Sequence, residues 1–202
     1  MAAQNRVTPF GDIVAIDQRG LFLGNRGSIH RDRTIVRPWQ GRRWITCALR
    51  YKDWVAPQWA PGRWTALFFW DEAVALAAGH RPCSLCRRAD FVHWLDAWER
   101  AFGERPQVAP MDRRLHEERV DGRAKRRHPL AWSDLPTGAF AVVDDQPMLV
   151  LDDRLVPWSA AGYGAPVARP RRGQALALTP PSTQAVIRHG YRPVFHPDAG
   201  DA

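Results

Sequence analysis

The sequence predicts an α+β fold, and three observations lead to this class. Between residues 20 and 70, short runs of β-prone residues alternate with glycines, which indicates short strands and turns. Residues 91–102 carry apolar side chains at helical spacing. From residue 138 onward, short apolar runs are separated by Asp-containing turns, as in an antiparallel β-meander. We therefore expect a small N-terminal module, two central helices, and a C-terminal β-meander with a closing helix.

The N-terminal module begins with three candidate strands at residues 20–24, 33–37 and 44–49. A first helix follows over residues 72–78. Asp71 precedes it as a predicted N-cap, because a carboxylate at that position accepts hydrogen bonds from the free N–H groups of the first turn. Gly79 is the expected stop, because glycine adopts the left-handed conformation that ends many helices.

The two central helices differ in the strength of their patterns. In the first, apolar side chains recur at i, i+3, i+4, i+7 and i+11, and Gly103 closes the helix. These side chains are Phe91, Trp94, Leu95, Trp98 and Phe102. The second central helix is expected from Met111 to about Val120, ended by Asp121 and Gly122. Residues 122–129 are expected to form a basic loop.

The C-terminal part contains three predicted strands in sequence, at residues 139–143, 148–151 and 155–158. A last strand is expected at residues 174–178. The closing helix should start after Thr179 as N-cap, with two prolines in its first turn, and should stop at Gly190.

The length of 202 residues allows one domain or two small ones. We expect a module at residues 1–90 and a second region at residues 91–202, packed together as one unit and forming a monomer. The start of the chain lacks the apolar stretch of a secretory signal, and no run reaches the roughly 18 apolar residues of a membrane span. These features predict a cytoplasmic protein with no membrane partner.

The formal net charge of +8 is concentrated in one segment. Residues 19–64 contain ten Lys or Arg and only Asp32 and Asp53 as acids, which favours binding of a polyanion. A GC-rich genome explains why Lys52 and Lys125 are the only lysines, but it does not explain this segregation of acids. The arginines predicted to contact nucleic acid are Arg26, Arg42, Arg43, Arg87, Arg88, Arg119, Arg126 and Arg127.

Tryptophans are interleaved with these arginines. Stacking on nucleic-acid bases is one use of such rings, and packing in the core is the more common one. We expect one or two of the following to be exposed: Trp39, Trp44, Trp54, Trp59, Trp64 and Trp70.

The three cysteines predict a metal site. Cys83 and Cys86 form a C-x₂-C pair in a turn between two helices, a spacing that lets two thiolates bind one tetrahedral ion. Cys47 is the only other cysteine, and His30 is the preferred fourth ligand, with His80 and His93 as alternatives. The expected cofactor is one structural Zn²⁺, because three Cys and one His leave no position open for water.

Two other interpretations of the cysteines remain. Cys47 could be an ordinary core residue, and Cys83 with Cys86 could be a redox pair. A thioredoxin-like pair would follow a strand in a βαβ unit, and this setting is not apparent in the sequence.

The run from Asp71 to Arg87, with its Gly79-His80-Arg81-Pro82-Cys83 core, resembles the second half of the Ada-type metal-binding domain of bacterial alkylation-repair proteins. It also resembles the His-and-Cys variant of that domain found on bacterial nucleases. The resemblance covers residues 20–90 and is specific at residues 72–87. It implies zinc on four ligands, binding to the DNA backbone, and Cys83 with Cys86 as the second ligand pair.

This chain departs from the family in its first ligand pair. The family has C-x₃-C there, or His and Cys in the variant, whereas His30 and Cys47 are only an approximate counterpart. The methyl-acceptor cysteine belongs to that pair, so the resemblance does not extend to methyl transfer from phosphotriesters. Over its whole length the chain also looks like a group of uncharacterised bacterial proteins of similar length, through segments 25–27, 44–47 and 179–183.

A candidate catalytic face lies on the second central helix. Asp112, His116 and Arg119 are spaced i, i+4 and i+7 and share one side, so a carboxylate could orient an imidazole beside a guanidinium. Glu118 lies on another side and Lys125 follows in the basic loop. Such pairs often only solvate a helix surface. Lys125 could form a Schiff base with an abasic sugar or simply contact a phosphate.

These features predict a zinc-stabilised DNA-binding protein of repair or processing, acting on damaged or modified DNA as a glycosylase, lyase or nuclease. One alternative is a non-catalytic zinc-dependent nucleic-acid-binding or regulatory module. Another is an enzyme acting on a small molecule, whose basic surface reflects genome composition alone.

Overall fold

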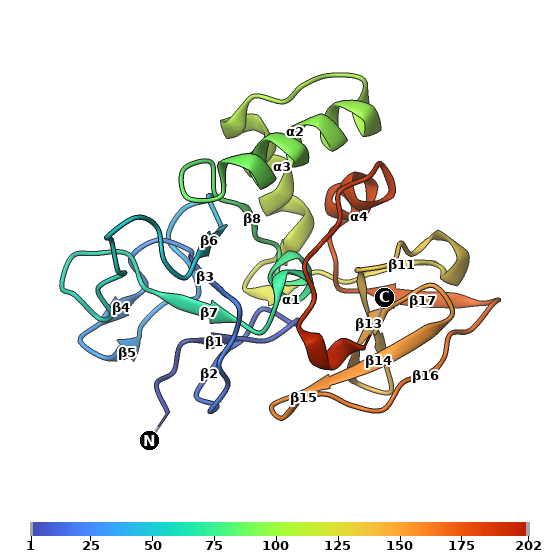
Figure 1. Cartoon of the computed structure of the whole chain (residues 1–202), viewed down its shortest axis with the longest axis horizontal. Helices are drawn as coiled ribbons and strands as arrows, with labels where there is room; N and C mark the ends of the chain where they lie inside the picture. The colour runs from blue at the N-terminus through green and yellow to red at the C-terminus, as the bar shows by residue number, and fades with distance from the viewer. Residues whose placement is uncertain (1, 201–202) are drawn as a thin grey trace.

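A computed structural model describes residues 2–200 and confirms the α+β class. Two sheets lie at opposite ends of the molecule, with the helices between and above them (Figure 1). The N-terminal sheet is mixed and carries the cysteines, and the C-terminal sheet is antiparallel. Among the described residues, no helix is long and apolar enough to cross a membrane.

The N-terminal sheet has the strand order β2-β1-β7-β3-β6-β8. Its strands are β1 (Arg6–Val7), β2 (Ile13–Val14), β3 (Phe22–Asn25), β6 (Ile45–Ala48), β7 (Leu67–Phe69) and β8 (Arg81–Pro82). The strand predicted at 33–37 is shorter: β5 (Thr34–Ile35) pairs with β4 (His30–Arg31) in a separate hairpin. Strand β8 pairs with β6 in parallel, and this pairing places the segment after residue 82 beside β6.

The C-terminal sheet has the strand order β11-β17-β12-β13-β14-β15, and β16 pairs with β14. Its strands are β11 (His128–Ala131), β12 (Phe140–Val143), β13 (Gln146–Val150), β14 (Arg154–Ser159), β15 (Gly162–Tyr163), β16 (Val167–Ala168) and β17 (Gln174–Ala177). The predicted meander is therefore present as β12, β13 and β14. Its turn at Asp144 and Asp145 has both residues in the left-handed region, as a tight hairpin requires.

The prediction of a basic loop at residues 122–129 was wrong. The segment turns at Gly122, where φ is +58°, and pairs β10 (Ala124–Lys125) with β9 (Val120–Asp121). It then enters β11, which lies beside β17. Lys125 is thus held in a hairpin rather than in a loop.

Helix α1 (Glu72–Ala77) begins at Asp71, whose side chain accepts from the Val74 N–H at 2.9 Å. Helix α2 (Arg88–Phe102) ends at Gly103, with φ of +80°. Helix α3 (Val108–Arg119) starts earlier than predicted, because Pro110 falls in its first turn, where the missing N–H breaks no helical bond.

Helix α4 (Pro181–Arg188) begins one residue later than predicted. Its N-cap is Pro180, and the Thr179 hydroxyl instead accepts from the Phe140 N–H at 2.8 Å in the sheet. Two 3₁₀ turns, at Trp132–Asp134 and Pro197–Ala199, complete the secondary structure of the described residues.

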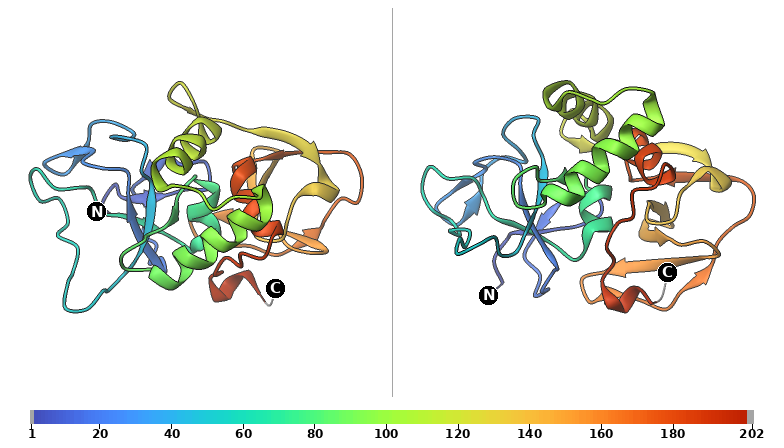
Figure 2. Two further views of the ribbon diagram at one scale, coloured as in Figure 1. Left: turned by 90° about the horizontal axis from the view of Figure 1, so that it is seen from above. Right: turned by 45° about the horizontal axis from the view of Figure 1, so that its top comes forward.

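The core joins the two ends of the molecule through α1, which both views of Figure 2 show between the N-terminal strands and the C-terminal part. All six residues of α1 are buried. Ala73 and Val74 pack with Phe140 and Leu149 of the C-terminal sheet, whereas Leu76 packs with side chains of α2, α3 and α4. The division at residue 90 remains a prediction.

Candidate functional site

The three cysteines converge. Their sulfur atoms all lie within 4.8 Å of one another, close enough to bind one metal ion. Cys47 comes from β6, while Cys83 and Cys86 lie in the turn between β8 and α2. A hydrogen bond of 2.8 Å from the Cys83 N–H to the Thr46 carbonyl fixes this turn against β6. The parallel β6–β8 pairing is therefore what assembles the cluster.

The three thiols differ in how readily they lose a proton, and only the pKa of Cys83 is lowered. Hydrogen bonds from Cys47 and Cys86 lower the pKa of Cys83 to about 2, and the Leu85 N–H also points at its sulfur, at 3.4 Å. Hydrogen bonds with Cys83 and Cys86 raise the pKa of Cys47. The contact with Cys47 lowers the pKa of Cys86, but the contact with Cys83 and burial outweigh it and leave that pKa raised. A thiolate is the form of cysteine that binds metal ions. The donor set of three soft thiolates suits Zn²⁺.

His30 is placed apart from the thiols. Its Nδ1 atom lies 2.6 Å from the Thr65 hydroxyl. Ala66 and Phe68 pack with the cysteines, and Leu67 packs with the apolar side chains on the other face of the sheet. His30 is not among the potential ligand atoms that lie within 4.8 Å of one another, which are the three cysteine sulfurs. The structure brings together the three predicted cysteines and not the predicted histidine.

The alternative histidines are engaged elsewhere. His80 is buried, with Nδ1 3.3 Å from the Ala75 carbonyl and Nε2 accepting from Arg26 Nε at 3.2 Å. The ring of His93 packs against Tyr191. Neither belongs to the group of potential ligands found among residues 2–200.

A second candidate site is a hollow of about 390 Å³ near β9 and β10. Arg26 and Arg119, which are 2% and 1% exposed, line it together with the half-buried Lys125. The other lining residues are Phe10, Gly11, Asp12, Ile13, Ile35, Val36, Arg37, Pro38, Trp39, Trp44, Ala78, Val120, Arg123 and Ala124. We call Arg26, Arg119 and Lys125 the cation cluster.

An aromatic ring holds two members of this cluster in place. Both Arg26 and Arg119 have their guanidinium carbon 4.1 Å from the ring centre of Trp44. Trp44 is 3% exposed and so acts as a structural spacer between two cations. Trp39 and Phe10, which are half-buried and line the hollow, are rings there that a ligand can reach.

The cation cluster is incompletely compensated. Arg26 donates to the Gly11 carbonyl at 2.8 Å, Arg119 to the Gly79 carbonyl at 2.7 Å, and Lys125 to the Ala77 carbonyl. Within the described part of the chain, none of the three forms a salt bridge with a carboxylate. Arg26 Nη2 and Arg119 Nε are buried without any hydrogen-bond partner.

Burial therefore weakens the protonation of all three groups. Desolvation lowers the pKa of Arg26 to about 9. It also lowers the pKa of Arg119, and that of Lys125 well below its usual range, with the neighbouring arginines adding to the effect. Buried cations are usually paired with acids. Their arrangement around a hollow indicates a site for an anion from outside the chain.

Gly79 makes room for this arrangement. Its φ is +94°, which favours glycine, and an added Cβ would lie 2.5 Å from Cδ of Arg119. Gly79, at the end of α1, therefore also leaves free the space that the Arg119 side chain occupies.

The predicted catalytic residues are not arranged as one group. Both oxygens of Asp112 accept from Arg81, at 2.7 and 2.9 Å, rather than orienting His116. His116 Nδ1 lies 3.0 Å from Arg119 Nη2, and desolvation with the nearby arginines lowers the pKa of His116 to about 4. Glu118 accepts from Ser182 at the start of α4. Of the four predicted residues, Lys125 alone lines the hollow.

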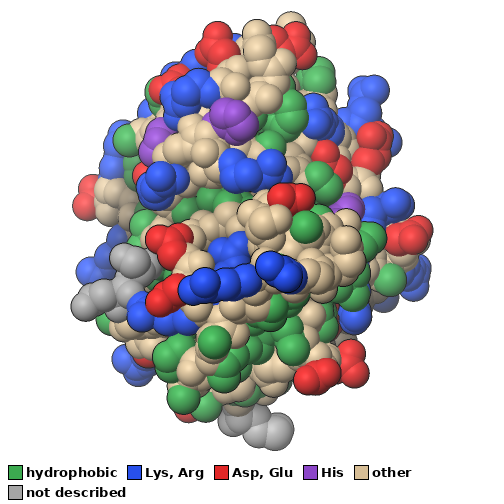
Figure 3. All heavy atoms as spheres, turned by 90° about the vertical axis from the view of Figure 1, so that its right-hand side faces the viewer, with side chains coloured by type: hydrophobic (Ala, Val, Ile, Leu, Met, Phe, Trp, Pro, Cys, Tyr) green, Lys and Arg blue, Asp and Glu red, His purple; other side chains and the backbone are tan. Residues whose placement is uncertain are grey.

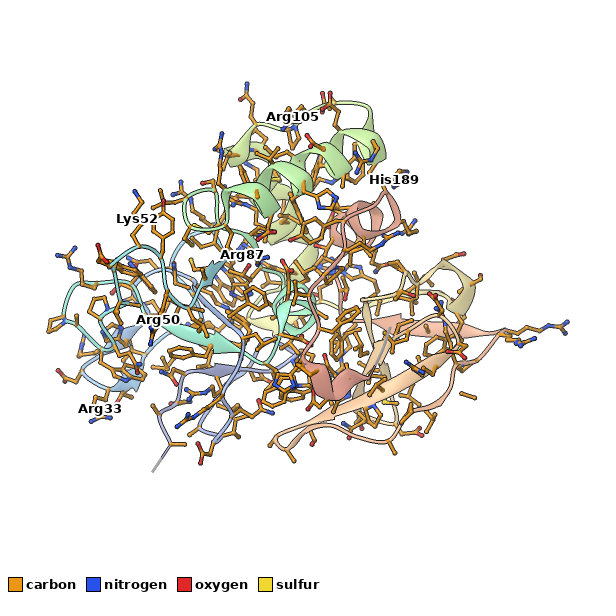
Figure 4. The ribbon with its side chains drawn as sticks, viewed as in Figure 1. Arg33, Arg50, Lys52, Arg87, Arg105 and His189 are labelled. Atoms are coloured by element: carbon orange, nitrogen blue, oxygen red, sulfur yellow. The ribbon has the colours of Figure 1, made fainter. Side chains whose placement is uncertain are left out.

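The predicted nucleic-acid arginines divide into two groups. Arg26, Arg87 and Arg119 are buried, and Arg87 lies near the centre of the molecule, bound to Glu72 at 2.8 Å (Figure 4). The others, Arg42, Arg43, Arg88, Arg126 and Arg127, are exposed. On the face at the right of Figure 1, basic side chains lie among acidic ones (Figure 3). Among the six interleaved tryptophans only Trp54 is exposed, which confirms the expectation of one or two.

Comparisons with family models, curated proteins and solved structures give no match for this chain. The Ada-type domain is therefore not identified by a family match, and what supports a metal site is the thiol cluster itself.

Proposed function

We propose that this protein is a zinc-stabilised DNA-binding protein of repair or processing, and that its hollow receives a phosphate of the DNA backbone. The observation that carries the proposal is the cation cluster: two buried arginines, each with an unpartnered nitrogen, line one cavity beside Lys125. A phosphate supplies both the negative charge and the acceptors that the two arginines lack.

The surroundings of the hollow favour a polymer over an isolated anion. Arg37 and Arg123 line it and are exposed, while Arg126 and Arg127 follow β10 directly. Trp39 offers a ring against which a base could stack beside the bound phosphate. A nucleotide displaced from its duplex, or a single strand, brings a phosphate and a base together.

The proposal includes fewer kinds of catalysis than the spacing of Asp112, His116 and Glu118 in the sequence suggested. Asp112 is bound to Arg81 and Glu118 to Ser182, so neither carboxylate is free to activate water for a nuclease or glycosylase. This supports binding, or chemistry at Lys125, over hydrolysis by paired carboxylates.

For the metal, we propose one Zn²⁺ held by Cys47, Cys83 and Cys86. Its role is to fix the turn before α2 to β6. His30 as fourth ligand would have to leave Thr65. Zinc content measured in purified wild type and in His30→Ala decides this: one zinc in both excludes His30, and zinc lost only in the variant supports it.

Binding to oligonucleotides tests the function. We expect affinity for single-stranded DNA that falls steeply with salt, and a salt slope reduced by about 0.7 for each phosphate contact removed. Arg37→Ala and Arg123→Ala should each reduce the slope because both side chains line the hollow. Arg172→Ala, an exposed arginine between β16 and β17, is the matched control and should leave binding unchanged.

Two results would overturn the proposal. Absence of binding to single-stranded, duplex and lesion-bearing oligonucleotides at low salt would exclude a DNA-binding protein. Equal losses in Arg172→Ala and Arg123→Ala would show that binding follows net charge rather than the hollow.

A further inference from the structure

Lys125 is the one lysine amine among the residues that line the hollow, and its setting suits attack on a carbonyl. Its Nζ donates a hydrogen bond to the carbonyl of Ala77, in the last turn of α1. An amine held through one N–H keeps its lone pair for another direction. The pairing of β10 with β9 keeps the lysine backbone in place. These contacts pre-position the amine.

The same cluster would keep this amine unprotonated. Arg26, directly after β3, and Arg119, the last residue of α3, lie near it, and their positive charges disfavour a third one. Desolvation acts in the same direction and is the larger cause. A lysine next to other cations in a partly buried site is an activated nucleophile, because only the neutral amine attacks.

We propose that Lys125 forms a Schiff base with the aldehyde of a phosphorylated sugar whose phosphate is bound by Arg26 and Arg119. This inference rests on the proposed function, because it needs the same phosphate site, and it names the substrate class of that site. Two compounds contain both this aldehyde and a phosphate: the ring-opened sugar of an abasic site in DNA, and free 2-deoxyribose 5-phosphate. The exposed arginines around the hollow favour the abasic site.

The step balances without a metal or redox cofactor. The Nζ lone pair attacks the aldehyde carbon, and a proton passes from nitrogen to the carbonyl oxygen to give a carbinolamine. A proton taken up from solvent lets that hydroxyl leave as water, and the nitrogen lone pair forms the C=N bond, which is protonated because the nitrogen keeps its remaining hydrogen. Addition of water reverses the sequence, so the adduct is a reversible covalent capture of the sugar.

Borohydride trapping tests the proposal. Sodium cyanoborohydride reduces the C=N bond to a stable secondary amine, which links protein to probe. Wild type should be trapped by an oligonucleotide with one abasic site and not by one carrying the reduced, alcohol form of that site. Lys125→Arg keeps a cation and should lose trapping at least tenfold while retaining binding to the reduced oligonucleotide.

The chain offers a matched control because it has only two lysines. Lys52 lies on the exposed segment after β6, away from the hollow lining (Figure 4). Lys52→Arg should therefore be trapped like the wild type. Peptide mapping of the trapped wild type should place the modification on residue 125. A modification on Lys52 or on the amino terminus would overturn the proposal.

The outcomes separate this inference from the proposed function. Binding to the reduced abasic oligonucleotide without trapping of the aldehyde form overturns the Schiff base and leaves DNA binding standing. No binding to the oligonucleotide together with no trapping of either aldehyde overturns both. Trapping of 2-deoxyribose 5-phosphate at residue 125, with none of the oligonucleotide, supports the Schiff base and assigns the site to a small phosphorylated aldehyde instead of DNA.

Discussion

Buried charges in this protein are compensated to very different degrees. Arg81 is 1% exposed and forms a bidentate pair with Asp112, which is 5% exposed. Arg26 and Arg119 are equally buried and have no such partner. The first pair stabilises the fold, and the lack of such a partner for Arg26 and Arg119 is why we propose them as a phosphate site, since a fold gains nothing from leaving cations unpaired.

Asp112→Ala should therefore destabilise the protein rather than only inactivate it. Removing one partner of a buried ion pair costs about 3–5 kcal/mol, because the other charge stays buried. The free energy of unfolding in urea measures this loss, with Asp121→Ala as control because Asp121 is exposed. A loss of activity with unchanged stability would instead return Asp112 to a catalytic role.

His116 makes a pH-dependent contribution. Its pKa in the fold is about 4, below the ordinary value of 6.5, so the native state binds fewer protons than the unfolded state between these values. This difference leaves the free energy of unfolding unaffected above pH 6.5. As the pH falls from 6.5 toward 4, the free energy of unfolding decreases, because the unfolded state takes up a proton that the folded state does not. The urea midpoint of His116→Gln, measured relative to that of the wild type, should therefore be higher at pH 4.5 than at pH 7. A constant difference would contradict this origin.

At the scale of elements, most helices and the meander could be predicted because their signals are local. The apolar spacing from Phe91 to Phe102, the N-cap Asp71 and the stop at Gly79 each act within a few residues. The order β11-β17-β12 could not be predicted, because it pairs segments about 40 residues apart with no local signal.

The candidate sites, like the helices and strands, could be predicted only where their residues carry a local signal in the sequence. The odd cysteine count pointed to a shared metal site, which the parallel β6–β8 pairing assembles. The cation cluster joins the residue after β3, the end of α3 and β10, and its arginines look like other arginines in the sequence. The scarcity of lysine was the one available signal for Lys125.

Glu118 shows an interaction between elements that helix spacing alone could not reveal. Its carboxylate accepts from the Ser182 N–H at 2.8 Å and from the Ser182 hydroxyl at 2.6 Å, and so caps α4 from another helix. Pro180, the N-cap, provides no side-chain hydrogen bond of its own. A carboxylate at this end also meets the positive end of the helix dipole.

Glu118→Ala should lower the free energy of unfolding by about 1–2 kcal/mol, the usual value of a lost helix cap. Glu117→Ala is the matched control: its side chain is exposed on the same helix, and it should change stability by less than about 0.5 kcal/mol. Thermal or urea unfolding of both variants measures the difference. Equal effects would show that Glu118 contributes only surface charge.

At the scale of the whole molecule, one buried carboxylate ties the two ends together. Glu72 at the start of α1 binds Arg87 at 2.8 Å and accepts from the Tyr191 hydroxyl at 2.6 Å and from the Val194 N–H at 3.1 Å. Arg87 follows the cysteine turn directly, whereas Tyr191 and Val194 lie after α4. The cysteine cluster is therefore linked to the C-terminal part through a few buried polar contacts.

Removal of the metal should consequently loosen the whole molecule rather than its N-terminal half alone. Losing the ion frees the turn before Arg87, and α1 shares its core with both sheets. Hydrogen exchange read by mass spectrometry, before and after a zinc chelator, measures this. Peptides from β12–β14 should gain exchange together with peptides from β3 and β6. Exchange confined to β3 and β6 would instead define two independent domains near residue 90, and unchanged exchange despite loss of zinc would remove the metal's structural role.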